Sequence, residues 1–149
     1  MTKNSFNPEN LKGGIGAVIR DDRGRFIAAC NDPVHYAIDA NTLEAMAVRR
    51  GLALANEVGC PKIIVQSDCL QVIETLQSGC FSSMAAAALF EDIIVQASTS
   101  SKCDFSFCNR EANSVVDCLA RETGTLPLVW VDEPPDFITA LLIDDVTII

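Results

Sequence analysis

Apolar and polar positions along the chain follow two periods, one typical of strands and one typical of helices. The segments "GAVIRD" and "RFIAAC" flank the polar stretch "DDRG", a pattern that predicts a β-hairpin with a tight turn. The apolar run in "KIIVQS" predicts a short strand that is buried on both faces. The alternation in "KCDFSFCN" predicts another strand.

Helical spacing covers most of the remaining chain. Segment 37–60 is predicted to be a long helix that ends at Gly59 and Pro61, with an apolar stripe made of Leu43, Ala47, Leu54 and Val58. Further helices are predicted at 68–78, 82–99, 110–124 and 136–146, and "VTII" at the end predicts a short strand. Strands that alternate with helices in this way predict an α/β domain with a mixed sheet.

The glycines at positions 13, 14 and 16 resemble a phosphate-binding G-x-G motif, but no helix follows them. They favour instead a strand that another backbone approaches closely.

Length, charge and hydropathy narrow the class of protein. A chain of 149 residues is the usual size of one domain, and no apolar run reaches the roughly 18 residues of a membrane span. The N-terminus is polar and does not read as a secretory signal. The net charge is −9, and residues 122–149 carry six acidic and no basic side chains, which counts against tight binding of nucleic acid.

The seven cysteines indicate reduced thiols. Their number is odd, none form a C-x-x-C pair, and His35 is the one histidine, so neither a disulfide framework nor a zinc site is expected. We therefore expect a cytoplasmic or nuclear location.

Three carboxylates have both a structural and a functional interpretation. Glu44 lies in the first turn of the long helix, Asp68 follows the "IIVQ" strand where ligands of open α/β sheets gather, and Asp117 lies within a later helix. Structurally, each has a partner at a suitable spacing: Asn41 and Glu44 form a capping box, Asp68 and Gln71 form another, and Asp117 pairs with Arg121.

Four segments together resemble one family. "GGIGAVIRDDRGRFIAA", "TLEAMAVRRGLALA", "IIVQSDCLQVIETL" and "FCNREANSVVDCLARE", from about residue 12 to 123, resemble the plant ribonuclease H-like domain of the reverse-transcriptase-like, retrotransposon-derived type. The resemblance implies an α/β fold, with a ribonuclease H-like mixed sheet flanked by helices on both faces. We expect residues 1–123 to form this domain and residues 124–149 to form an acidic extension packed on or beside it.

The resemblance also implies an activity, namely Mg²⁺-dependent hydrolysis of the RNA strand of an RNA–DNA hybrid. Four carboxylates would hold two Mg²⁺ ions, which prefer oxygen ligands. Glu44, Asp68 and Asp117 match three of the four, and so become the expected catalytic and metal-binding residues.

The chain departs from the family at the first carboxylate. "TKNSF" stands where the family has an aspartate on its first strand, and Lys3 takes the place of that aspartate. We therefore expect the first, central strand to be truncated or absent, and the domain to be catalytically impaired. It would act as a protein-interaction module with a protein partner or as a homodimer, and would bind hybrids weakly at best. The alternatives are an active Mg²⁺-dependent ribonuclease and a non-catalytic nucleic-acid binder.

A short first strand would leave a slot in the sheet. Residues 1–8 would fill it in part, and the remainder could come from "VTII", from a second copy or from a partner protein. The expectation favours an intermolecular strand.

Overall fold

The computed structural model describes residues 2–7, 12–35, 39–82 and 84–145. The strands are β1 (Thr2–Asn7), β2 (Lys12–Arg20), β3 (Phe26–Val34), β4 (Lys62–Ser67), β5 (Lys102–Phe107) and β6 (Leu128–Val131). The helices are α1 (Ala40–Glu57), α2 (Leu70–Ser78), α3 (Ala87–Ser98), α4 (Ser114–Arg121) and α5 (Asp136–Asp145), with a 3₁₀ turn at Glu111–Asn113 before α4.

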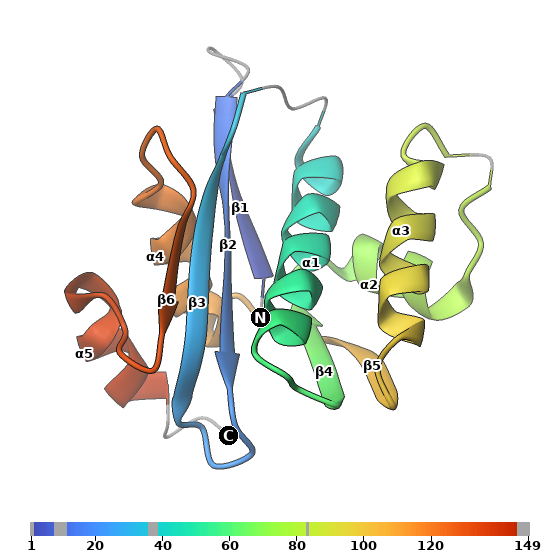
Figure 1. The fold of residues 1–149 in the computed structure, drawn as a ribbon. Coiled ribbons are helices and arrows are strands. Elements are labelled where there is room, and N and C mark those ends of the chain that lie inside the picture. The colour runs from blue at the N-terminus through green and yellow to red at the C-terminus, as the bar shows by residue number, and fades with distance from the viewer. Residues whose placement is uncertain (1, 8–11, 36–38, 83, 146–149) are drawn as a thin grey trace.

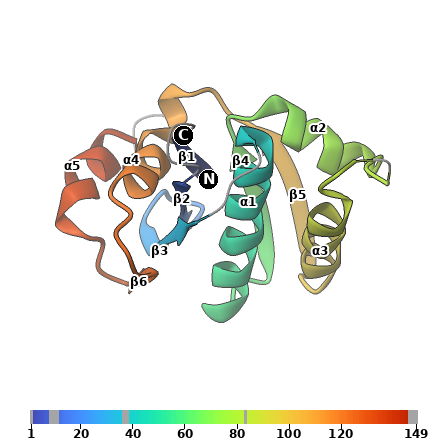
Figure 2. The ribbon, with the colours of Figure 1, turned by 90° about the horizontal axis from the view of Figure 1, so that it is seen from above.

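The strands form one mixed sheet in the order β5-β4-β1-β2-β3-β6. The β1–β2, β2–β3 and β3–β6 pairs are antiparallel, and the β1–β4 and β4–β5 pairs are parallel. Helices α1, α2 and α3 cover one face, and α4 and α5 cover the other (Figures 1 and 2). This is the predicted α/β architecture with helices on both faces.

The hairpin between β2 and β3 is held by its turn residues. The Asp21 carboxylate accepts hydrogen bonds of 2.9 Å from the backbone N–H groups of Arg23 and Arg25. Gly24 has a φ of 79°, which is the left-handed conformation that glycine adopts without strain. The predicted hairpin is therefore confirmed, with longer strands than expected.

Helix α1 begins differently from the prediction. Its N-cap is Asp39, whose carboxylate accepts a 2.6 Å hydrogen bond from the N–H of Thr42. The predicted capping box of Asn41 and Glu44 is wrong, because both residues already lie inside the helix. The end of the helix is as expected: Gly59 follows the C-cap with a φ of 79°.

Helix α2 also begins one residue later than the capping box requires. Its N-cap is Cys69, and the Cys69 side chain makes no capping hydrogen bond. The interpretation of Asp68 as the N-cap is therefore wrong. The Asp68 carboxylate stands before the helix, at the end of β4.

Each face of the sheet has its own core. On one face, α1, α2 and α3 pack around Val48, Val72, Phe90 and Ile93, with Val65 of β4. On the other face, α4 and α5 pack on β2 and β3 through the buried cluster Val18, Ala29, Val115, Val116, Leu119 and Ile138.

Glycines in β2 let α4 approach the sheet closely, as the sequence predicts. A Cβ atom on Gly16 would lie 2.8 Å from Cβ of Leu119, and one on Gly14 would lie 2.6 Å from the carbonyl oxygen of Ala120. Side chains at these positions would push α4 away from the sheet.

The first strand is present but short. β1 pairs with β2 over six residues, whereas its described pairing with β4 is the single register pair of Thr2 with Ser67. The chain after α4 adds β6 to the edge of β3 and packs α5 against α4, with Trp130 and Phe137 in an edge-to-face contact at 5.9 Å. The predicted strand "VTII" lies outside the described residues. Among the residues described, no helix is long and apolar enough to cross a membrane.

Candidate functional site

Glu44 lies on the face of α1 that packs against the sheet. It is 1% exposed, and one of its carboxylate oxygens accepts a 2.6 Å hydrogen bond from the hydroxyl of Ser67, the last residue of β4. A buried carboxylate needs such donors, because a buried polar group without a hydrogen-bond partner destabilises the fold by about 1–3 kcal/mol, and a charged group by more. The Ser67 hydroxyl also accepts a 3.1 Å hydrogen bond from the N–H of Cys69.

Asp68 follows directly, at the carboxyl end of β4. Its side chain is 7% exposed, and Arg110 approaches it with a distance of 3.9 Å between Nε and Oδ2. The Arg110 side chain is 89% exposed, so a cation lies above a largely covered carboxylate. Arg110 follows β5, and the carboxyl ends of two parallel neighbours such as β4 and β5 lie at the same edge of the sheet.

Glu44 and Asp68 both lie close to Cys69. Burial raises the pKa of the Cys69 thiol, and the negative charges of Glu44 and Asp68 raise that pKa further. The thiol of Cys69 contacts Asn41 Oδ1 at 3.2 Å, and Asn41 Nδ2 donates to Gln71 at 2.6 Å. These contacts join the start of α1 to the start of α2 beside the two carboxylates.

Asp117 is in a more exposed environment. It lies on α4 with a side chain that is 42% exposed, and its Oδ2 is 3.7 Å from Nε of Arg121 one turn later. The predicted i,i+4 pair is therefore confirmed. The charge of Asp117 acts on its neighbour Cys118, whose thiol pKa is raised mainly by burial.

The position of Lys3 is set by the backbone register of β1. Lys3 stands opposite Gly16, and the preceding residue, Thr2, pairs with both Ala17 and Ser67. Gly16 is the residue against which α4 packs, and Ser67 is the residue bonded to Glu44. Lys3 therefore occupies the sheet position that lies between the three elements carrying the three carboxylates.

The three predicted carboxylates are not gathered into one metal-binding group among the described residues. Among them, no three His, Cys, Asp or Glu side chains are grouped so that they could hold a metal ion. One Glu44 oxygen is occupied by the Ser67 hydroxyl, and Arg110 places a cation near Asp68. The assignment of Glu44, Asp68 and Asp117 to metal binding stays a prediction from the resemblance.

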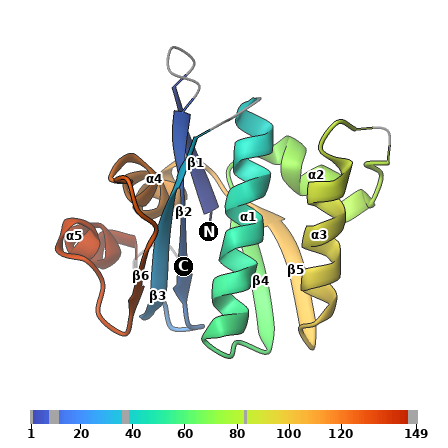
Figure 3. The same cartoon turned by 45° about the horizontal axis from the view of Figure 1, so that its top comes forward.

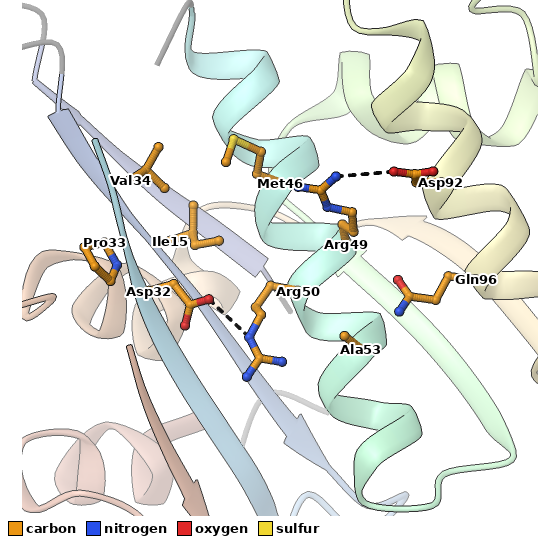
Figure 4. Close-up of a pocket in the computed structure, with 10 residues that line it drawn as sticks. All are labelled: Ile15, Asp32, Pro33, Val34, Met46, Arg49, Arg50, Ala53, Asp92 and Gln96. Atoms are coloured by element: carbon orange, nitrogen blue, oxygen red, sulfur yellow. Dashed lines mark hydrogen bonds and ion pairs between the residues drawn. The ribbon is translucent and has the colours of Figure 1, made fainter. Parts of the chain in front are cut away.

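A separate cavity of about 510 Å³ lies between the β2–β3 hairpin, α1 and α3. Figure 4 shows two arginines of α1 in it, each paired with an acid: Arg49 with Asp92 at 3.4 Å and Arg50 with Asp32 at 3.2 Å. None of the three predicted site residues lines this cavity. Its charges are balanced by these pairs, so it offers no cationic site for a phosphate.

Two residues of the site were missed from the sequence, Ser67 and Arg110. Ser67 directly precedes Asp68 at the end of β4, but its hydrogen-bond partner, Glu44, is 23 positions away on α1. The position of Arg110 near Asp68 could have been expected from the sequence, because Arg110 follows a strand that is parallel to β4.

Comparison with known proteins agrees with this fold. Residues 2–123 match the reverse transcriptase-like family. No curated protein matches the chain in sequence.

Solved structures of ribonucleases H are similar in fold. The N-terminal RNase H domain of Rv2228c from Mycobacterium tuberculosis has a TM-score of 0.75 at 20% identity, covering 81% of this chain and 88% of that one. RNase H1 from Halobacterium salinarum NRC-1 has a TM-score of 0.76 at 18% identity, covering 81% and 92%. LC11-RNase H1, solved in complex with an RNA/DNA hybrid, has a TM-score of 0.73 at 20% identity, covering 82% and 92%. The match over most of its length and the shared fold show that this chain belongs to the reverse transcriptase-like family and forms an RNase H-like domain.

Proposed function

We propose that this RNase H-like domain does not hydrolyse RNA–DNA hybrids and instead works by binding another protein. The observation that carries the proposal is the backbone position of Lys3, opposite Gly16 and one residue after the Thr2–Ser67 pair. The resemblance to the family expects an aspartate at that position. A lysine cannot supply the carboxylate ligand that the resemblance implies, and its side chain carries a charge of the same sign as Mg²⁺.

The surroundings of Glu44 and Asp68 support the loss of metal chemistry. Glu44 is engaged by Ser67, and Arg110 lies 3.9 Å from Asp68. The Ser67 hydroxyl satisfies one acceptor oxygen of Glu44, and the Arg110 guanidinium offsets part of the Asp68 charge, in both cases without a metal ion. Glu44, Asp68 and Asp117 would then be remnants of a metal site, and the first two would serve stability.

Weak affinity for nucleic acid follows from the charge. A hybrid is a polyanion, and its affinity for a protein comes largely from basic side chains. The net charge of this chain is −9, and Arg49 and Arg50 are each paired with an acidic residue. Micromolar or weaker binding at physiological salt is expected.

The surface around β6 suits a protein partner. β6 is an edge strand of the sheet, and edge strands with exposed apolar side chains are typical of pairing sites. The apolar side chains exposed on and beside it are Leu126, Leu128, Val129, Val131 and Phe137. A protein strand added to β6, from a different protein or from a second copy, would cover them. We place this role in the cytoplasm or nucleus, which suits seven cysteines that form no disulfide.

A hybrid-cleavage assay in Mg²⁺ or Mn²⁺ tests the loss of activity. The unmodified chain is expected to be inactive, and Lys3→Asp to gain cleavage that is lost again in Lys3→Asp/Asp68→Asn. Lys3→Asn is the matched control, because it removes the charge without restoring a carboxylate. Robust cleavage by the unmodified chain that Asp68→Asn abolishes would overturn the proposal.

Affinity capture from cell extract followed by mass spectrometry tests the interaction role. Leu128→Lys/Val131→Lys is expected to remove a specifically bound protein. Val95→Lys, at an exposed apolar position on α3, serves as the control and is expected to retain it. Equal recovery with both variants would exclude the β6 surface.

A Mg²⁺-dependent ribonuclease is the second candidate. The observation in its favour is that two of the three predicted carboxylates, Glu44 and Asp68, do lie beside the same residue, Cys69. A related fold has also been solved with an RNA/DNA hybrid. A third possibility is a non-catalytic nucleic-acid binder. Such a protein would give a nanomolar gel shift with the hybrid and no product in the cleavage assay.

A further inference from the structure

One edge of the sheet is formed by β6, on the side away from β5 (Figure 3). β6 pairs antiparallel with β3 over Leu128–Val131, and no described strand lies on its other side. A strand at a sheet edge carries backbone N–H and C=O groups that another chain can bind. The hydrogen-bond register decides which groups of β6 these are.

Two residues of β6 direct their backbone groups away from β3. The N–H of Asp132 donates a 2.9 Å hydrogen bond to the carbonyl oxygen of Ile27, one register step beyond the last pair of the ladder. In antiparallel strands, residues that bond to the neighbour alternate with residues that do not. The even-numbered residues of β6 therefore bond to β3, and Val129 and Val131 point their N–H and C=O groups outwards.

A tight turn limits this open edge at its C-terminal end. The N–H of Glu133 donates a 2.8 Å hydrogen bond to the carbonyl oxygen of Val131 across Asp132, whose φ is 67°. One of the outward groups is thus already bonded. In the part of the chain that the structure describes, the groups left for a partner are the N–H and carbonyl of Val129 and the N–H of Val131.

We propose that β6 binds an extended segment of another protein as a further strand, antiparallel to β6. The segment begins with basic residues and continues with uncharged, β-branched residues. It exchanges two backbone hydrogen bonds with Val129 and accepts a third from the N–H of Val131. This rests on the protein-binding role proposed above and adds the chemistry of the partner.

The side chains of the open edge suit an uncharged strand. Val129 and Val131 are both exposed, and alternation places them on the face of the sheet opposite Trp130, which packs with α4 and α5. Leu128 is exposed on the Trp130 face. Apolar side chains of an added strand would cover these residues on both faces of the sheet.

The charge beside the open edge is acidic. Asp132 and Glu133 follow the strand directly and are exposed, and the chain has no basic residue after Arg121. Of the two arginines in the neighbouring β2–β3 turn, Arg25 is already paired with Asp21 at 2.9 Å. This local charge, together with the net charge of −9, disfavours a second copy of the chain and favours a basic segment.

The place of these carboxylates sets the order of residues in the segment. β6 already pairs antiparallel with β3, and antiparallel pairs are the commoner kind. In such a pair, the residues opposite Asp132 and Glu133 precede the residue opposite Val129. The basic residues therefore come first in the segment.

Fluorescence of Trp130 measures the binding, because it is the one tryptophan of the chain and lies in β6. The probe is an acetylated, amidated peptide of two lysines followed by about four alternating valines and threonines, close to the usual length of a strand. One control peptide has glutamates in place of the lysines, and another has the lysines at its C-terminal end. We expect the probe to bind about tenfold more tightly than either control, and added salt to reduce the difference.

Variants of the chain separate backbone pairing from charge. Val129→Pro removes an outward N–H, which edge strands tolerate, and should weaken binding of the probe about tenfold, whereas Val129→Thr should bind it like the unmodified chain. Asp132→Asn/Glu133→Gln should bind the lysine and glutamate peptides alike. Glu74→Gln/Glu91→Gln is the matched control, because it removes the same charge from exposed positions on α2 and α3, at the other end of the sheet (Figure 2). It should keep the preference for lysine.

Two results would overturn the proposal. One is equal affinity of the unmodified chain for the lysine and glutamate peptides, which also decides the matter if Val129→Pro fails to fold. The other is a dimer in light scattering that Val129→Pro converts to a monomer, because the occupant of the edge would then be a second copy.

The same peptides separate this proposal from the proposed function. A protein captured from extract through β6 should be released by the lysine peptide and not by the glutamate peptide. If neither peptide releases it, the partner chemistry is wrong and the protein-binding role stands. Hybrid cleavage by the unmodified chain would contradict the proposed function and would leave the peptide affinities as they are.

Discussion

The hydroxyl of Ser67 donates a 2.6 Å hydrogen bond to the carboxylate of Glu44, and both residues are fully buried. This contact joins the end of β4 to the inner face of α1. It fixes a buried carboxyl group inside the domain, next to the position where the first strand begins.

Ser67→Ala should destabilise the domain by about 1–3 kcal/mol, because it removes a donor from a buried carboxylate and an acceptor from the Cys69 N–H. Urea denaturation measures the change. Ser98→Ala is the control, since the exposed Ser98 hydroxyl donates to the local Val95 carbonyl and loss of this bond should cost little. A Ser67→Ala variant as stable as the control would show that other groups satisfy Glu44.

Gly16→Ala should lower the free energy of unfolding by about 1–3 kcal/mol, because the added methyl group would lie 2.8 Å from Cβ of Leu119 and force α4 outwards. Thermal or chemical denaturation measures this loss. Gly124→Ala is the matched control, since a Cβ there meets nothing within 4 Å. Equal stability of the two variants would contradict the close packing of α4 on β2.

Asp117→Asn should change stability by no more than about 0.5 kcal/mol, because its ion pair with Arg121 is exposed to solvent. Arg121→Gln breaks the same pair from the other side and should have an effect of similar size. A loss above about 2 kcal/mol in Asp117→Asn alone would indicate that the carboxylate has a buried partner of its own.

Cys30 should be the least reactive of the seven thiols. Burial raises its pKa to about 12 from an ordinary value of 9.0, and the residue is fully buried. At about pH 8, Ellman's reagent should label the exposed Cys80 first and Cys30 only after global unfolding. Rapid labelling of Cys30 in the folded protein would contradict this burial.

The same pKa shift gives a dependence of stability on pH. The thiol of Cys30 titrates near 9.0 when unfolded and near 12 when folded, so its contribution is present below pH 9.0 and is lost as pH rises through 12. Cys30→Ala should therefore lose less stability than the unmodified chain between these pH values. Parallel slopes in the two proteins would show that Cys30 does not contribute.

The sequence predicts those parts of the fold that depend on local periodicity. The hairpin, the long helix and the strand before Asp68 follow from apolar spacing, and the close approach at Gly14 and Gly16 follows from the missing side chains. The predicted burial of that strand on both faces is wrong, because Ile64 is 66% exposed. Cap positions were wrong by one or two residues, because Asp39 and Asn41 are both good caps and only the backbone conformation distinguishes them. β6 was not predicted, since a four-residue edge strand with exposed apolar side chains lacks alternation.

The candidate site was less predictable than the fold. The Ser67–Glu44 and Arg110–Asp68 contacts connect residues that are 23 and 42 positions apart, and their geometry depends on helix placement. The three carboxylates could be identified from the sequence. Their proximity in space could not be predicted, because it depends on packing across both faces of the sheet.

The single Thr2–Ser67 pair also bears on how the domain folds. β1, β2 and β3 are contiguous in residues 2–34 and can pair as soon as they are synthesised, whereas β4 and β5 must be brought in by a crossover through α1. The described residues form one backbone pair between these two halves. Helix α1 therefore couples them, through Leu43 on the β2 side and Val48 on the β4 side. Damage to α1 should therefore convert two-state unfolding into a transition with a populated intermediate, in which the antiparallel half persists after the parallel half has melted.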